Sequence, residues 1–159
     1  MIVEPSIRIG TIDDVETLAR HRCEMFREMG TLSEEGYSEL MPASVAYFRE
    51  AIPAGRYLAW LVCSGETIVA GGGMKIDIGA PRPGPGGRML SPGPQGLIMN
   101  VYVETEWRRR GIARMLIEHM IEYGRSHGFP SLTLHASAAG RPLYEQLEFK
   151  PTNEMRLFL

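Results

Sequence analysis

One segment in the second half of the chain constrains the fold most: an apolar run that leads through three arginines into an amphipathic helix. The run LIMNVYV, residues 97–103, is apolar almost throughout, which is typical of a central strand covered on both faces. From Gly111 onward apolar residues recur at helical spacing as far as Gly128, and Pro130 prevents the helix from continuing. SLTLH, residues 131–135, is the next expected strand. Because such a crossover is right-handed, the two strands should lie parallel and side by side.

The remaining segments predict a mixed α/β fold in one domain that spans residues 1–159. In the first half we expect a short strand around Ile7 and Ile9 and a helix that begins at the capping signal of Thr11 and Asp14 and ends near Glu28. Gly36 and Pro42 interrupt the next helical stretch, so residues 33–50 should form two short helices or one kinked helix. The other expected elements are a hairpin of strands 57–63 and 67–78, a short helix over 142–147 and a closing strand over 154–159. Together they predict a central sheet of six or seven strands. Residues 79–96 are dense in proline and glycine and predict a long exposed loop, either functional or a tolerated insertion.

Charge and composition exclude several classes of function. The formal net charge of -2 argues against a protein that coats nucleic acid or anionic membrane, so any anion must be met locally. Cys23 and Cys63 lie far apart among apolar residues, and the four histidines lack the spacing of metal ligands, so we expect two buried thiols and no metal. The N-terminus has no signal pattern, and no stretch reaches the roughly 18 apolar residues of a membrane span, which favours a cytoplasmic protein.

The turn EWRRRGIA places Arg108, Arg109 and Arg110 directly before the N-terminus of the expected helix. A helix N-terminus carries unpaired amide donors and partial positive charge, so this turn should bind phosphate. Gly111 and the small Ala113 let the backbone approach the anion, which favours a diphosphate. Neither GxxxxGK[ST] nor GxGxxG occurs in the chain, which excludes the two commonest nucleotide motifs. The alternative is a solvated surface turn of arginines.

The spacing of Arg108, Gly111 and Ala113 resembles R/Q-x-x-G-x-G/A, the acetyl-CoA signature of the GNAT superfamily of N-acyltransferases. This resemblance implies a mostly antiparallel sheet with one parallel, splayed strand pair flanked by helices. It also implies acetyl-CoA as co-substrate, with the pyrophosphate on the backbone amides of the turn and the pantetheine arm along the strand near Tyr102 and Val103. The coenzyme-binding residues implied by the signature are Arg108, Arg109, Arg110, Gly111, Ile112 and Ala113.

A second match lies downstream, where PLYEQLEF, residues 142–149, is similar to the LYxKLGF segment of the same family. Tyr144 then falls at the tyrosine that borders the coenzyme and protonates its departing thiolate. Two positions differ from the family pattern. Ser137 replaces a frequent asparagine and keeps its hydrogen-bonding capacity, so we expect it to border the coenzyme. Glu148 replaces a glycine, so a strained or altered turn is expected there.

The base that deprotonates the amine is not defined by the same resemblance. Some members of the family carry it on the strand before the signature, where this chain has Leu97 and Met99. Neither side chain can accept a proton. Glu104, just past the strand, and His135, on the neighbouring strand, are the remaining candidates, with water as a third possibility.

The sequence therefore predicts an N-acetyltransferase that moves an acetyl group directly from acetyl-CoA to a primary amine of a small molecule, an amino acid or a peptide. The alternative is a GNAT-like module that binds acyl-CoA without catalysis, as a sensor or stabiliser. Binding of nucleic acid is disfavoured by the charge. The resemblance also allows a homodimer, and the residues available to line an acceptor site are Met25, Met29, Tyr37, Met41 and Tyr47.

Overall fold

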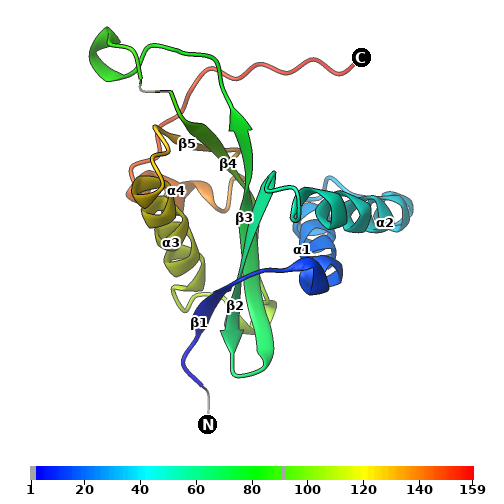
Figure 1. The fold of residues 1–159 in the computed structure, drawn as a ribbon. Helices are drawn as coiled ribbons and strands as arrows, with labels where there is room; N and C mark the ends of the chain where they lie inside the picture. Colours follow the sequence, from blue (N-terminus) through cyan, green and yellow to red (C-terminus); the bar gives the residue numbers. More distant parts are fainter. Residues whose placement is uncertain (1–2, 91) are drawn as a thin grey trace.

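The computed structural model describes residues 3–90 and 92–159. In chain order its elements are β1 (Ser6–Ile9), α1 (Val15–Glu28), α2 (Glu34–Ala51), β2 (Tyr57–Ser64), β3 (Thr67–Ile78), β4 (Pro94–Val103), α3 (Ile112–Ser126), β5 (Leu132–Leu134) and α4 (Arg141–Gln146), with short 3-10 turns at Ile12–Asp14, Pro85–Gly87 and Thr105–Trp107. The sheet runs through the middle, with α1 and α2 on one side and α3 and α4 on the other (Figure 1). No helix in the described ranges is both long and apolar enough to span a bilayer.

The sheet has the order β1-β2-β3-β4-β5, in which β4 and β5 are parallel and every other pair is antiparallel. The predicted hairpin, the parallel crossover pair and the mixed α/β class are confirmed. The predicted strand number is wrong, because five strands form within the described residues.

The missing strand is the one expected over residues 154–159. This segment extends away from the sheet (Figure 1), and its apolar side chains Met155, Leu157 and Phe158 are largely exposed. A strand needs a hydrogen-bonded neighbour as well as an apolar pattern. The tail has no backbone partner among the described residues, so the pattern alone is not sufficient.

The two N-terminal helices are formed by local caps and by packing on each other and on the sheet. The predicted capping box is present. Thr11 Oγ1 accepts from the backbone nitrogen of Asp13 at 3.3 Å, and the Asp14 carboxylate accepts from Thr11 N at 2.8 Å. Of the two alternatives expected over 33–50, that of two short helices is wrong, because α2 is one continuous helix with Pro42 inside it. An interior proline costs about 3 kcal/mol. Burial of Phe48 and Ala51 offsets this cost.

Two apolar clusters lie on the two faces of the sheet, and both predicted thiols are buried. The first cluster joins α3 to the sheet and contains Trp60, Val62, Val69, Ala70, Met74, Ile98, Ile112, Leu116, Ile117 and Met120. The second joins α1 and α2 to the sheet and contains Val15, Leu18, Ala19, Phe48, Ala51, Tyr57, Ala59, Leu61 and Cys63. The sheet therefore separates two independently packed layers.

Three consecutive glycines, residues 71–73, lie in the middle of β3, between these layers. A Cβ on the first would lie 3.0 Å from His21 Nδ1 on α1, and one on the second would lie 3.1 Å from Met120 Cε on α3. A Cβ on the third would lie 2.4 Å from the carbonyl oxygen of Leu58 on β2. Atoms of α1, α3 and β2 therefore occupy the space that a side chain at each of these three glycines would need.

The loop predicted over 79–96 ends three residues earlier, because Pro94, Gln95 and Gly96 begin β4 and pair with β3. A proline is tolerated at the first residue of a strand, where its missing N–H is least costly. Residues 79–90 of the loop are mostly exposed and turn back on themselves through a bridge between Pro83 and Met89.

Candidate functional site

The turn between β4 and α3 is formed by two residues in the left-handed region. Arg109 has φ 62° and Gly111 has φ 78°. Gly111 is also the N-cap of α3 and provides no side-chain cap. A glycine adopts this conformation without strain, so the chain can turn sharply into the helix here.

The backbone amides of residues 109–114 donate to no acceptor within residues 3–90 and 92–159. On either side of them the pattern of internal bonds resumes, with Arg108 N donating to Thr105 O at 3.3 Å and Met115 N donating to Gly111 O at 3.0 Å. Such a row of donors at the positive end of a helix dipole fits the oxygens of a diphosphate. The turn therefore has the donor set that a coenzyme pyrophosphate requires.

The three arginines of the turn have different surroundings. Arg108 points back to the body of the protein, where its Nε donates to Val103 O at 2.9 Å and its NH2 donates to both carboxylate oxygens of Glu28 on α1, at 2.8 and 2.9 Å. Arg109 and Arg110 are exposed, and the Arg110 guanidinium lies 5.0 Å from the Trp107 ring centroid. Arg108 thus anchors the turn, while its two neighbours can reach a bound anion.

The parallel strands β4 and β5 separate just before the turn. They pair only from Gly96 to Ile98 on β4 and from Leu132 to Leu134 on β5. Beyond Ile98, β4 continues to Val103 with β3 as its only partner in the described chain. The β4 edge near Tyr102 and Val103 therefore has no strand partner on the side of the opening among the described residues, although the Val103 carbonyl accepts from Arg108 Nε. An extended ligand could use the other backbone groups of this edge.

A β-bulge in β4 lies at the start of this opening. The register with β3 shifts there, since Met99 pairs with Gly73 while Tyr102 pairs with Gly71, and Asn100 has φ 62°. The Asn100 side chain is buried, and its Nδ2 donates to the hydroxyl of Tyr57 at 3.0 Å. Sequence reasoning missed Asn100, although a polar side chain within the apolar run LIMNVYV was a signal.

Tyr144 lies on α4, partly buried against the α3-side cluster, with the Phe149 ring 6.1 Å away. Burial raises the pKa of Tyr144, so its hydroxyl keeps its proton at neutral pH. That hydroxyl has no hydrogen-bond partner among the described residues. Nearby, Ser137 Oγ accepts from Gly140 N at 3.1 Å and so fixes the turn before α4. Glu148 has φ 68°, the altered conformation expected from its replacing a glycine.

Glu104 lies at the end of β4 and is held by α1. Its Oε1 accepts from Arg20 and lies 3.1 Å from Nε2 of His21. Burial opposes ionisation of Glu104, but these hydrogen bonds from Arg20 and His21 outweigh it and keep its pKa below the ordinary value. Burial lowers the pKa of His21, which favours a neutral ring that donates from Nε2. Glu104 is therefore a carboxylate with little remaining basicity.

His135 directly follows β5 at the mouth of the opening. Leu132 and Leu134 pack toward the α3 side of the sheet, so by strand alternation Thr133 and His135 face the side that carries α1. The imidazole is more than half exposed and its Nε2 is hydrogen-bonded to Glu154 of the tail. Leu97 and Met99, on the neighbouring strand, offer no titratable group.

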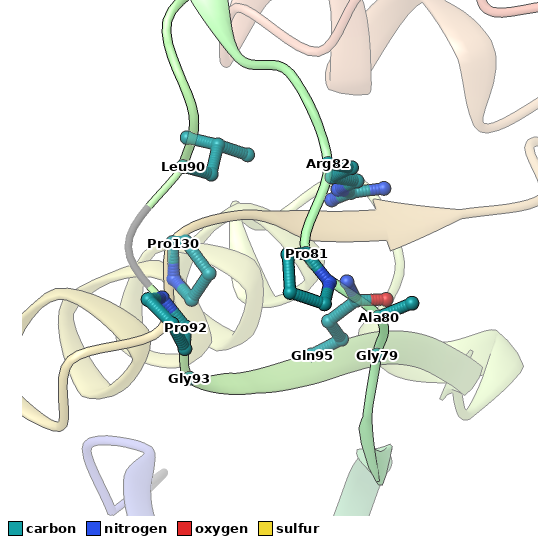
Figure 2. A pocket seen from close by; sticks show the side chains of 9 residues that line it. All are labelled: Gly79, Ala80, Pro81, Arg82, Leu90, Pro92, Gly93, Gln95 and Pro130. Carbon is teal, nitrogen blue, oxygen red and sulfur yellow. The ribbon is translucent and has the colours of Figure 1, made fainter.

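Two hollows lie elsewhere in the described structure. One, of about 10 Å³, lies at the base of the loop, where Pro81, Pro92 and Pro130 surround it (Figure 2). It has room for about one water molecule. The other is a groove of about 430 Å³ between α3, β5 and residues 147–152. Neither hollow includes a residue of the arginine turn.

Comparisons with known proteins agree with this geometry. The sequence model of the acetyltransferase (GNAT) family matches residues 16–149. A GCN5-related N-acetyltransferase from Ralstonia eutropha JMP134 has a similar structure, with a TM-score of 0.87 and 29% identity over 98% of this chain and 99% of that one. A predicted acetyltransferase from Clostridium acetobutylicum, solved with acetyl-CoA, shares the fold at a TM-score of 0.80 and 21% identity over 98% and 96% of the two chains.

A curated relative matches over a shorter stretch. It is the [ribosomal protein bS18]-alanine N-acetyltransferase of Salmonella typhimurium, 36% identical over 58 residues. The match covers 35% of this chain and 39% of that protein.

Proposed function

Because this chain belongs to the GNAT family of acetyltransferases, we propose that it transfers the acetyl group of acetyl-CoA directly to the primary amine of an acceptor. The family makes it an acyltransferase and acetyl-CoA the expected donor. The observation that carries the proposal is the row of backbone amides over residues 109–114, which has no internal acceptor and lies beside the opening between β4 and β5.

We assign the parts of the donor to the parts of this site. The pyrophosphate binds the amides of residues 109–114, and the exposed side chains of Arg109 and Arg110 add positive charge. The pantetheine arm runs along the open edge of β4 at Tyr102 and Val103, as an added strand would. Ser137 holds the turn that leads to Tyr144.

The acceptor amine must be neutral to attack, yet an alkyl amine has a pKa of about 10.4 and is mostly protonated at neutral pH. We propose His135 as the base that takes this proton, since it faces the opening and Glu104 is already engaged by two donors. The Nε2 of His135 donates to Glu154, so Nδ1 is the nitrogen that accepts the proton. Glu104 then holds α1 against the end of β4.

The amine nitrogen attacks the thioester carbonyl, and backbone N–H groups on the open β4 edge stabilise the oxyanion that develops. The tetrahedral intermediate collapses by cleavage of the carbon–sulfur bond. Tyr144 donates its proton to the departing thiolate, which gives the N-acetylated product and free coenzyme A. The raised pKa of Tyr144 keeps that proton available at neutral pH.

Replacement of Tyr144 tests this assignment. Tyr144→Phe should lower kcat roughly a hundredfold, the low end of general acid catalysis, while the thermal shift produced by acetyl-CoA stays unchanged. Thiol release over a panel of amines measures the first quantity. Tyr123→Phe, a half-buried tyrosine of α3 that is stacked on His127, is the matched control and should retain full activity. Unchanged turnover in Tyr144→Phe would remove Tyr144 from the mechanism.

The absence of a titratable side chain at Leu97 and Met99 favours a second candidate, a module that binds acyl-CoA without catalysis. The same assay separates the two. Stabilisation by acetyl-CoA with no thiol release for any amine would support the binding module, and no stabilisation by any acyl-CoA would contradict both.

A further inference from the structure

Arg22, on α1, differs from the other partly buried arginines of the described chain. Each of the others pairs with a carboxylate, and these pairs are Arg20 with Glu104, Arg108 with Glu28 and Arg114 with Glu118. Arg22 has no carboxylate within ion-pair distance among the described residues. It is a cation held in the protein without a counter-charge.

The contacts of Arg22 are with neutral groups. Its NH1 donates to Asn100 Oδ1 at 2.6 Å, and its guanidinium carbon lies 4.8 Å from the centre of the Phe26 ring. No other nitrogen of the guanidinium has an acceptor in the described residues. Burial lowers the pKa of Arg22, yet a guanidinium stays protonated in proteins, so the charge remains and most of its donors have no protein acceptor among the described residues.

The nearest acidic residue on the same helix is already engaged. Glu24 accepts from the Tyr37 hydroxyl at 3.0 Å and lies 3.5 Å from Arg27. Other polar groups near Arg22 are the phenols of Tyr47 and Tyr57 and the thiol of Cys23. The part of the chain that the structure describes therefore supplies no anion for this site.

The position of Arg22 connects it to the reaction. Asn100, which receives its hydrogen bond, is the bulge residue at which β4 begins to run without β5. This is the side of the sheet that carries α1 and α2, opposite the α3-side cluster. In the proposed mechanism the acetyl group lies in this opening, so Arg22 borders the space that the acceptor must enter.

We propose that Arg22 binds a carboxylate of the acceptor, which makes the substrate a carboxylate-bearing amine such as an amino acid. The inference rests on the proposed acetyl transfer and adds the substrate class. A planar guanidinium binds a carboxylate through two parallel hydrogen bonds, which satisfies the unused donors and compensates the charge. Anchored there, the acceptor presents its amine to the thioester in the opening.

Matched pairs of amines test the proposal. Phenylalanine is compared with phenethylamine, lysine with cadaverine and 4-aminobutyrate with butylamine, each by thiol release from acetyl-CoA. The wild-type protein should have a kcat/KM at least tenfold higher for the carboxylate-bearing member of one or more pairs. Arg22→Met should remove this preference by lowering kcat/KM for that member alone, and Arg22→Lys should restore part of it.

Arg49→Met is the matched control, because Arg49 is exposed on α2 and lies 3.9 Å from Glu16. It should leave the preference intact. The acetyl-CoA thermal shift of each variant reports folding and donor binding separately. If an Arg22 variant does not fold, the preference of the wild-type protein alone decides the question.

The proposal is overturned if amines are acetylated with no preference for the carboxylate, if phosphoethanolamine is preferred over every carboxylate-bearing amine, or if the preference survives in Arg22→Met. Absence of acetylation for every amine contradicts the proposed function instead, so the two failures are distinguishable.

Discussion

The two faces of the sheet differ in the groups that they offer to a ligand: backbone amides on the α3 face and side chains on the α1 face. On the α3 face, an apolar cluster supports a turn whose backbone amides have no acceptor among the described residues and are the proposed ligand-binding groups. On the α1 face, side chains of α1 meet those of β4 in polar contacts, such as Arg22 with Asn100 and His21 with Glu104. A binding site made of backbone needs only the right conformation, whereas one made of side chains depends on the identity of each. The α3 face is therefore suited to an invariant donor and the α1 face to a particular acceptor.

The sharpest test of this contrast compares two candidate bases on the α1 side. His135→Gln should lower kcat roughly a hundredfold, because the amine then loses the group that takes its proton. Glu104→Gln should leave kcat within about threefold, since that carboxylate is engaged by Arg20 and His21 and acts only in holding α1. Thiol release at saturating acetyl-CoA measures both. The reverse order of effects would transfer the role of base to Glu104.

A smaller effect is expected from glycines at the two ends of α3. Gly111 has φ 78° and Gly128 has φ 72°, and a Cβ at either would meet nothing within 4 Å. Alanine at each should therefore cost a similar ~1 kcal/mol of unfolding free energy. Only Gly111→Ala should weaken acetyl-CoA binding, by about tenfold or ~1.4 kcal/mol. Calorimetric titration and urea unfolding separate the two quantities, and equal weakening by both variants would argue against the amide site.

The smallest expected effect is a loss of unfolding free energy at low pH, which should arise on the α1 side of the sheet. The hydrogen bond from Arg8 lowers the pKa of Asp14, which also closes the capping box of Thr11. A pKa lowered by folding stabilises the protein above the unfolded value of about 3.9, and this contribution is lost as pH falls through the folded value. Asp14→Asn should thus cost ~1 kcal/mol at pH 7, and the difference should shrink below about pH 4.

Urea unfolding at a series of pH values measures this difference. Asp13→Asn is the control, since Asp13 is exposed and its side chain makes no hydrogen bond or ion pair in the described structure. It should change the unfolding free energy by less than about 0.5 kcal/mol throughout. A constant cost of Asp14→Asn down to pH 2 would exclude the ion pair as its origin.

Most of the fold could be predicted from the sequence, because its signals are local. The capping box at Thr11, the turn of the β2–β3 hairpin and the crossover through α3 each depend on residues close together in the chain. The errors arose where tertiary structure decides. Packing of α2 keeps it continuous through Pro42, and the tail at 154–159 has no partner strand in the described part of the chain despite its apolar pattern.

The candidate site divides in the same way. The arginine turn could be predicted from five consecutive residues, RRRGI, because its donors are backbone amides and its shape depends on neighbouring residues, with Arg109 and Gly111 both in the left-handed region. The contact of Arg22 with Asn100 joins residues 78 positions apart, and that of Asn100 with Tyr57 joins residues 43 apart. These side chains come together only in the folded chain. The β-bulge that turns Asn100 toward α1 is not predicted by any local sequence pattern.

The three glycines of β3 limit how a protein of this kind can diverge. Each position is closed by an atom from a different neighbour, so a substitution there requires a simultaneous change on α1, on α3 or on β2. Arg22 is less restricted, because it is only partly buried and makes a single hydrogen bond, to Asn100 Oδ1, within the described structure. Duplicated copies that acquire new acceptors should therefore retain residues 71–73 and change at position 22, so that selection among amines can vary while the sheet beneath them stays the same.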